Sequence, residues 1–163
     1  MQSIPTIDIS PLKDTAHPDH DATVQRILDA CTDIGFLSIT GTGVSPDTVD
    51  QVRVKTRAIF DIDEQSKWDQ AITRDNYRGY IPMGFFTPND GSGKADKYEG
   101  YKLHFEVSED HPVRDDCALY GPNLWPAEVQ GAQEVILEYW SQLDHVAELL
   151  LGALEIGLAL KPN

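Results

Sequence analysis

The segment Tyr-Arg-Gly-Tyr-Ile-Pro-Met-Gly, at residues 77–84, decides the fold of this 163-residue sequence. Residues 77–81 and residues 98–107 both favour an extended conformation. Between them, residues 87–96 are rich in glycine, proline, asparagine and aspartate, a composition typical of a loop. The sequence therefore predicts two extended segments joined by a long loop.

Upstream of this segment, the sequence predicts a strand, a helix and a second strand. Residues 4–9 alternate apolar and polar side chains, which favours a strand, and residues 36–40 form the second extended run. The helix is expected over residues 17–33, and Gly35 follows where a left-handed helix end is needed. Its apolar residues share one helical face: Val24, Ile27, Leu28, Cys31 and Ile34.

Helices are expected over most of the remaining chain. Ser45 and Pro46 are typical of a helix start, and this helix should run to about residue 60. Residues 61–69 favour a further short helical piece, and residues 129–160 favour a long helix with a broad apolar face. A sheet of two short strands is marginal alone. The long helix therefore needs a large partner surface, which predicts one part of a larger α+β fold.

The net charge of −14, from 27 acidic and 13 basic residues, excludes two classes of partner. Nucleic acids and anionic membrane surfaces both require a basic binding surface. Two cysteines are too few for a disulfide framework, and Cys31 is expected to be buried on its helix. The N-terminus lacks the features of a signal peptide, and residues 146–160 are too short to span a bilayer. We therefore expect a cytoplasmic protein.

Two histidine patterns could in principle hold a metal ion. A non-haem iron site needs two imidazoles and one carboxylate on one face. His17 and Asp19 form a His-x-Asp pattern, whereas His104, Glu106 and His145 form His-x-Glu with a distant histidine. Short patterns of this kind occur by chance in an acidic chain, and His145 falls on the long helix. The sequence therefore favours no metal site and leaves these residues as weak candidates.

Arg78, which lies between two tyrosines, is a candidate for binding a carboxylate. A planar guanidinium suits bidentate binding of such a group. The alternative is a structural ion pair with a nearby acid such as Asp75 or Glu99. The residues alone favour the structural alternative slightly.

The order and spacing of five segments resemble the N-terminal region of isopenicillin N synthase-like, Fe(II)/2-oxoglutarate-dependent oxygenases. These segments are residues 4–9, 35–39, 77–84, 96–101 and 121–126. The resemblance implies the N-terminal helix-and-strand portion of a double-stranded β-helix, or jelly roll, with most of the jelly roll absent from residues 1–163. The iron ligands and the Arg-x-Ser pair that grips 2-oxoglutarate are then expected in a downstream jelly-roll core.

The same resemblance implies a role for the segment at residues 77–84 and the residues that follow it. In such relatives this segment faces the mouth of the active site, which makes Arg78, Tyr80, Met83, Phe85 and Phe86 candidates for substrate binding. The two phenylalanines would indicate an apolar portion of the substrate, or else ordinary core packing. The full-length protein would oxidise a small molecule with Fe(II) and 2-oxoglutarate, by hydroxylation, desaturation or ring closure. The chain alone is expected to be inactive and to bind neither cofactor tightly.

Two competing hypotheses remain open. The first is a non-catalytic acidic module that binds a protein partner through its long helix. The second is a compact metal enzyme that uses His104, Glu106 and His145. In the leading hypothesis, the natural packing partner of the chain is the missing jelly roll.

Overall fold

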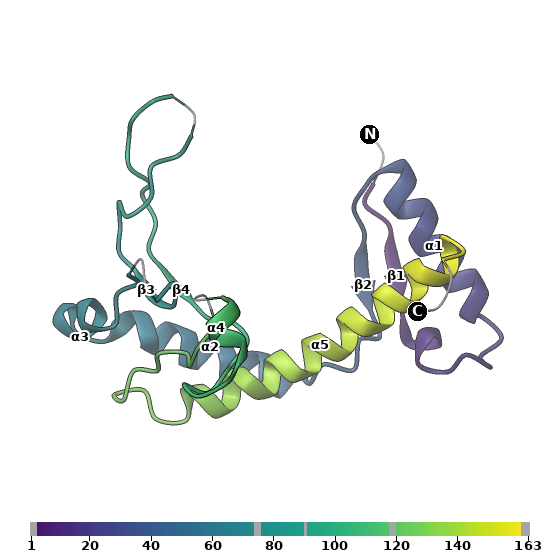
Figure 1. The fold of residues 1–163 in the computed structure, drawn as a ribbon. Coiled ribbons are helices and arrows are strands. Elements are labelled where there is room, and N and C mark those ends of the chain that lie inside the picture. Colours follow the sequence, from purple (N-terminus) through teal and green to yellow (C-terminus); the bar gives the residue numbers. More distant parts are fainter. Residues whose placement is uncertain (1–2, 74–75, 90, 118–119, 161–163) are drawn as a thin grey trace. The chain divides into compact units, whose positions relative to one another are not determined.

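The computed structural model describes residues 3–73, 76–89, 91–117 and 120–160. Its contacts divide the chain into two compact units, the first formed by residues 1–51 and 135–163 and the second by residues 52–134. In chain order the elements are β1 (Thr6–Asp8), η1 (Ser10–Lys13), α1 (His20–Asp33), β2 (Ser38–Thr40), α2 (Pro46–Asp61), α3 (Glu64–Asp69), β3 (Gly79–Ile81), β4 (Gly100–Lys102), α4 (Val113–Asp116) and α5 (Ala132–Gly157) (Figure 1).

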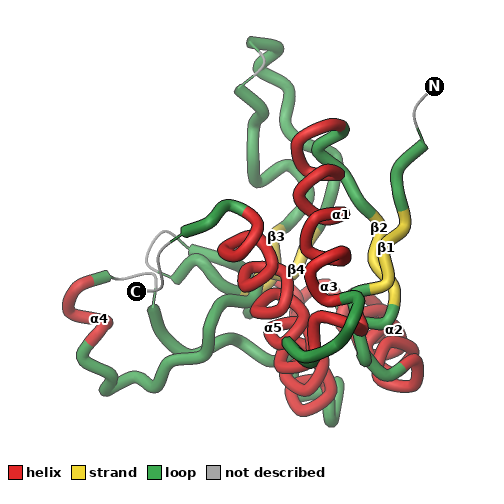
Figure 2. The backbone as a smooth tube through the Cα atoms, turned by 90° about the vertical axis from the view of Figure 1, so that its right-hand side faces the viewer, coloured by secondary structure: helices red, strands yellow, loops and turns green. Residues whose placement is uncertain are grey.

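The first unit contains a short parallel sheet whose two strands are connected through α1. In β1 and β2, Thr6 pairs with Ser38 and Asp8 pairs with Thr40. Parallel strands need a crossover connection, and α1 provides it. Figure 2 shows the two strands in yellow, side by side. The predicted strand, helix and second strand are therefore confirmed, with strands shorter than expected.

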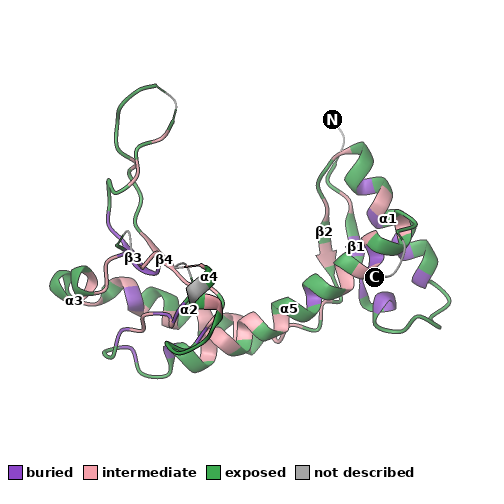
Figure 3. Ribbon diagram, in the orientation of Figure 1, coloured by how far each residue is buried: buried purple, intermediate pink, exposed green. Residues whose placement is uncertain are grey.

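The core of the first unit forms where α1, β1, η1 and α5 meet. Ile7 and Ile9 of the β1 segment are almost fully buried, at 1% and 0% exposed. Figure 3 shows buried positions of this unit in purple. The other buried members of the cluster are Leu12, Val24, Ile27, Ala30, Val146 and Ala153. Burial of such side chains contributes roughly 1.5–3 kcal/mol for each large aliphatic residue.

The prediction that Cys31 is buried is wrong. Cys31 is exposed, and the buried face of α1 instead carries Thr23, Val24, Ile27 and Ala30. These positions repeat at helical spacing but define a face rotated away from Cys31. Of the predicted apolar face of α1, only Val24 and Ile27 are buried in the core.

The second unit contains α3 and the β3–β4 hairpin. Asp63 begins α3 by accepting a hydrogen bond from the Ser66 backbone N–H, over 3.0 Å. The hairpin is antiparallel, with Gly79 opposite Lys102 and Tyr80 opposite Tyr101. These strands lie in the two segments for which the sequence predicts extended structure, and they are joined by the long loop visible in Figure 1.

Helix α5 is amphipathic only in part. Val146 and Ala153 are buried, whereas Leu143, Leu151 and Ile156 are 40%, 65% and 53% exposed. The predicted long helix is confirmed, and part of its apolar surface is uncovered in the described chain. No helix of the described residues combines the length and the apolar character that crossing a membrane requires.

Candidate functional site

The inner face of the β3–β4 hairpin packs against α3. Side chains alternate between the two faces of a strand, and the cross-strand pair Tyr80 and Tyr101 lies on this inner face. The Tyr80 hydroxyl donates to Glu99 Oε2 over 2.7 Å, and its ring meets Trp68 edge to face with centroids 6.5 Å apart. The Tyr101 hydroxyl donates to Gln70 Oε1 and to the Leu124 carbonyl oxygen, both over 2.8 Å. These bonds hold the hairpin to the rest of the second unit.

These surroundings raise the pKa of the Tyr80 hydroxyl. Burial, then the hydrogen bond to Glu99 and the charges of Glu99 and Glu64, raise the pKa of Tyr80 from its ordinary value of 10.0 to about 12. Because the folded pKa is the higher one, this stabilising contribution is complete below pH 10 and is lost as the pH rises towards 12. We expect Tyr80→Phe to remove the step near pH 12 from an ultraviolet absorbance titration of tyrosine ionisation. An unchanged titration curve would contradict this assignment.

The outer face of the hairpin carries an aromatic cluster with a lysine on it. The Tyr77 ring meets Phe86 edge to face, with centroids 6.2 Å apart, and Phe86 meets Phe85 in the same manner at 4.9 Å. The Lys102 ammonium lies 3.6 Å from the centroid of the Tyr77 ring, a cation–π contact. The His104 ring also lies near the Tyr77 ring, and His104 Nε2 donates to the Tyr77 carbonyl oxygen over 3.1 Å.

Arg78 lies away from solvent, in a charged environment. Its side chain is only 1% exposed, and its Nε has no hydrogen-bond partner among the described residues. Burial lowers the pKa of its guanidinium, the negative charge of Glu106 raises it, and the positive charge of Arg114 lowers it again. Arg78 Nη1 and Arg114 Nε lie 3.9 Å and 3.7 Å from the position that a Cβ on Gly121 would occupy.

The acidic neighbour of Arg78 is therefore not the predicted Glu99. Glu99 instead accepts from Tyr80 and pairs with Lys67 Nζ over 3.5 Å. The other predicted partner, Asp75, lies outside the described residues. Glu106 occupies the position near Arg78 because residues 104–107 run beside residues 121–123, where Val107 N donates to the Gly121 carbonyl oxygen over 3.2 Å.

Asn123 is a member of this site that the sequence patterns did not indicate. It is 6% exposed, and its Nδ2 donates to Glu106 Oε2 over 2.6 Å and to the His104 carbonyl oxygen over 2.7 Å. Its backbone N–H donates to Glu106 Oε1 over 3.0 Å, and its Oδ1 accepts from the His104 N–H over 2.9 Å. Asn123 thus holds both carboxylate oxygens of Glu106 beside Arg78. The motif at residues 121–126 contained this residue but gave no sign of its partners.

Comparison with known proteins now assigns the family. The model of the family described as "non-haem dioxygenase in morphine synthesis N-terminal" matches residues 4–128. The chain belongs to this non-haem dioxygenase N-terminal family. The resemblance inferred from the five sequence segments is therefore confirmed.

Individual relatives extend the match over nearly all of the chain's length. It is 31% identical to homoarginine-6-hydroxylase 2-ODD-C23.1 of Arabidopsis thaliana, over 99% of the chain and 50% of the relative. It is 29% identical to the 2-oxoglutarate-dependent dioxygenase tropC of Talaromyces stipitatus, over 95% of the chain and 49% of the relative. The chain thus spans about half the length of the curated relatives it matches.

Solved structures share the fold of this chain, and the chain again covers about half of each of them. A 2OG-Fe(II) oxygenase family protein from Caulobacter crescentus superposes with a TM-score of 0.80 at 22% identity, over 99% of this chain and 50% of that one. A full-length Neurospora crassa protein, solved in complex with alpha-KG and thymine, gives 0.75 at 20% identity, over 97% and 49%. The prediction of an α+β fold that forms the N-terminal portion of these oxygenases is confirmed.

Family members use Fe(II) and 2-oxoglutarate, as the names of such relatives state. The described part of this chain contains no group of three or more His, Cys, Asp or Glu side chains that could hold a metal ion. Glu106 has both oxygens bonded to Asn123, and His145 belongs to the first unit, where its Nδ1 lies 3.9 Å from Glu148 Oε2. The Glu106 carboxylate is thus engaged by Asn123 within the second unit, and none of the weak candidates His104, Glu106 and His145 belongs to a metal-holding group among the described residues.

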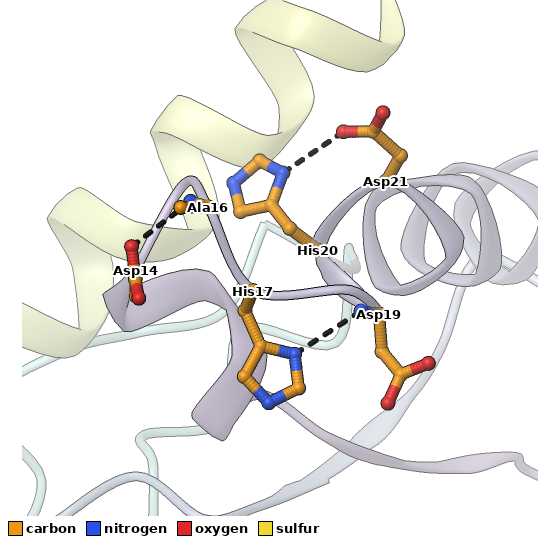
Figure 4. A network of polar contacts seen from close by, with 6 residues as sticks. All are labelled: Asp14, Ala16, His17, Asp19, His20 and Asp21. Carbon is orange, nitrogen blue, oxygen red and sulfur yellow. Dashed lines mark hydrogen bonds and ion pairs between the residues drawn. The ribbon is translucent and has the colours of Figure 1, made fainter.

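The His17-x-Asp19 pattern serves the start of α1 instead. Figure 4 shows His17 turned towards the following backbone, where its Nδ1 accepts from the Asp19 N–H over 3.1 Å. The neighbouring His20 is 6% exposed and bonds through Nδ1 to Asp21 Oδ1 over 3.0 Å. His17 and His20 therefore each bond to a residue one or two positions further along the chain.

The five substrate-binding candidates divide into two groups. Arg78 and Tyr80 are buried, at 1% and 7% exposed, whereas Met83 and Phe85 are 67% and 43% exposed and Phe86 is half-buried. Only the second group presents side-chain surface to solvent, and its member Phe86 contacts Tyr77, whose ring also contacts the Lys102 ammonium. Tyr77 and Lys102 were not among the predicted contact residues. Side-chain alternation along β4, which places Lys102 on the face opposite that of Tyr101, is the signal that could have indicated Lys102.

Proposed function

We propose that this chain is the N-terminal part of a non-haem Fe(II)/2-oxoglutarate-dependent dioxygenase that oxidises a small molecule in the cytoplasm. The observation that carries the proposal is the family match over residues 4–128, together with relatives that are about twice as long. In this proposal residues 1–163 form one incomplete domain. A downstream jelly roll completes the domain, covers the exposed apolar residues of α5, and supplies the ligands for Fe(II) and the site for 2-oxoglutarate.

The contribution of this chain is then to bind and orient the substrate. Phe85 and Phe86, whose rings are in contact, and the exposed Met83 supply apolar side chains that can contact the substrate and exclude water from it. Arg78 and Tyr80 support these side chains without contacting the substrate, because both are buried and the Tyr80 hydroxyl donates to Glu99. Bound Fe(II) and 2-oxoglutarate supply the oxidising chemistry, for hydroxylation, desaturation or ring closure.

Relatives act on chemically different molecules. The Arabidopsis relative is named for homoarginine, and the Neurospora structure contains thymine. A shared fold does not imply a shared substrate, because the substrate is selected by particular side chains at the site. The proposal therefore covers the reaction class, and the substrate must be inferred from the residues of this chain.

Turnover of 2-oxoglutarate tests the proposed function. The chain joined to a downstream jelly-roll half should convert 2-oxoglutarate to succinate in the presence of Fe(II), whereas residues 1–163 alone should show only background conversion. The physical reason is the lack of a three-ligand group in the described chain. Tight stoichiometric binding of Fe(II) by residues 1–163 alone would contradict the proposal.

A non-catalytic interaction module is the second candidate. The observation that favours it is the exposure of three large apolar side chains on α5, Leu143, Leu151 and Ile156, which a protein partner can cover. In that case residues 1–163 should be monodisperse and melt cooperatively by themselves. Aggregation, or strong binding of a dye specific for apolar surface, would favour the incomplete dioxygenase domain.

A further inference from the structure

We infer that the outer face of the hairpin recognises a small molecule that combines an apolar ring with a carboxylate. This inference rests on the proposed function, because it names the substrate class of the same surface. The apolar ring would lie on Phe85 and Phe86, and the carboxylate would bind the Lys102 ammonium. Each half of the assignment has its own structural support.

The aromatic half of the site is a contiguous set of rings. Phe85, Phe86 and Tyr77 follow one another in edge-to-face contacts with interplanar angles of 80° and 74°. Phe85 remains 43% exposed and Met83 is 67% exposed, so the set ends in accessible apolar surface. Edge-to-face geometry is favourable for aromatic rings, and a further ring can extend the series in the same way.

The cationic half of the site is Lys102, whose ammonium lies over the Tyr77 ring at one end of that series of rings. Lys102 lies opposite Gly79 in the strand register, so no side chain on β3 obstructs its stem at that position. Its Nζ lies 3.6 Å from the Tyr77 centroid. A cation–π contact fixes the ammonium, yet a lysine ammonium has three N–H donors, and those pointing away from the ring can bind an acceptor.

The nearest acidic residues along the β4 segment are engaged by other groups. Glu99 accepts from the Tyr80 hydroxyl and pairs with Lys67. Glu106 has one oxygen bonded to the Asn123 backbone and the other to its side chain. Lys102 is therefore directed to the aromatic rings and not to these carboxylates, and an anionic ligand can supply the charge that complements it.

Two probes of nearly equal shape separate the contribution of charge from that of the ring. Phenylacetate and phenylacetamide would each be titrated into the full 163-residue chain, and binding followed by NMR shifts of the Phe86 and Lys102 amides. We expect phenylacetate to bind about three- to fivefold more tightly at low salt, the range for a partly exposed ion pair. The preference should fall in about 0.5 M NaCl through ionic screening.

Variants of two lysines assign the preference to a residue. Lys102→Gln should remove the preference for phenylacetate and leave phenylacetamide binding unchanged, whereas Lys102→Arg should retain the preference. Lys97→Gln removes the same charge from an exposed position of the connecting loop and should leave the preference intact. Unchanged binding of the neutral phenylacetamide shows that Lys102→Gln is folded, and Lys102→Arg shows whether another cation at this position is sufficient.

Three results would overturn the inference: equal binding of both probes to the unchanged chain, a preference that survives Lys102→Gln, or no binding of either probe. None of these results bears on 2-oxoglutarate turnover by the longer protein. A dioxygenase that turns over 2-oxoglutarate but shows no charge preference would retain the proposed function and lose only this substrate class.

Discussion

Replacing Gly79 by alanine is expected to lower the free energy of unfolding by roughly 4 kcal/mol. Gly79 has a φ of +99°, which residues with a side chain rarely adopt. A Cβ at this position would also collide with the Gln70 carbonyl oxygen and would lie 3.0 Å from Leu124 Cδ1. The carbonyl cannot move freely, because it accepts the Tyr80 N–H over 2.8 Å. Urea unfolding followed by circular dichroism would measure the loss.

Gly84→Ala is the matched control for this substitution. Gly84 has a similar φ of +82°, but the nearest atom to its added Cβ is Ala95 Cβ at 3.5 Å, an ordinary contact. We expect this variant to lose only about 1–2 kcal/mol, from backbone strain alone. Equal losses in the two variants would show that the close approach of Gln70 to Gly79 does not matter.

The end of α1 and the start of α2 were predictable because their signals are local. Gly35 has a φ of +76° after the end of α1, as the sequence predicts. The Ser45 hydroxyl accepts from the Thr48 N–H over 3.4 Å at the start of α2, the expected N-cap arrangement. Both features depend only on neighbouring residues, so a single sequence is sufficient to find them.

Side-chain partners across the chain were not predictable in the same way. Cys31 shares its helical stripe with Val24 and Ile27, and periodicity alone does not say which edge of a stripe meets the core. The sequence suggested Glu99 as a neighbour of Arg78 and gave no indication of Glu106, whose charge acts on Arg78 in the structure. The outcome depends on how residues 104–107 align with residues 121–123, a pairing that no local pattern encodes.

The proposed substrate surface was only partly indicated by the sequence. The resemblance indicated the segment that contains Met83, Phe85 and Phe86, and these side chains do present surface to solvent. It did not indicate Lys102, because a lysine in an acidic chain is usually a solvated surface residue. Only the hairpin register, which sets Lys102 opposite Gly79, brings its ammonium onto Tyr77.

Replacing Asn123 by alanine is expected to cost about 3 kcal/mol of unfolding free energy. The substitution removes the two hydrogen bonds donated by Nδ2, to Glu106 and to His104, and the one accepted by Oδ1. It leaves the Glu106 carboxylate with the Asn123 backbone N–H but without the side-chain amide. Asn89→Ala, at an exposed loop position, is the matched control and should change stability by no more than about 0.5 kcal/mol.

A double-mutant cycle identifies the partner responsible for that cost. If Asn123 acts chiefly by holding the Glu106 carboxylate, then Asn123→Ala should cost at least about 1 kcal/mol less in a chain that already carries Glu106→Gln. The reason is that loss of this hydrogen-bond donor costs less free energy when the acceptor is a neutral amide than when it is a carboxylate. Additive effects would mean that Asn123 stabilises the chain only through the backbone of His104, and that Arg78 does not depend on it for the placement of its acidic neighbour.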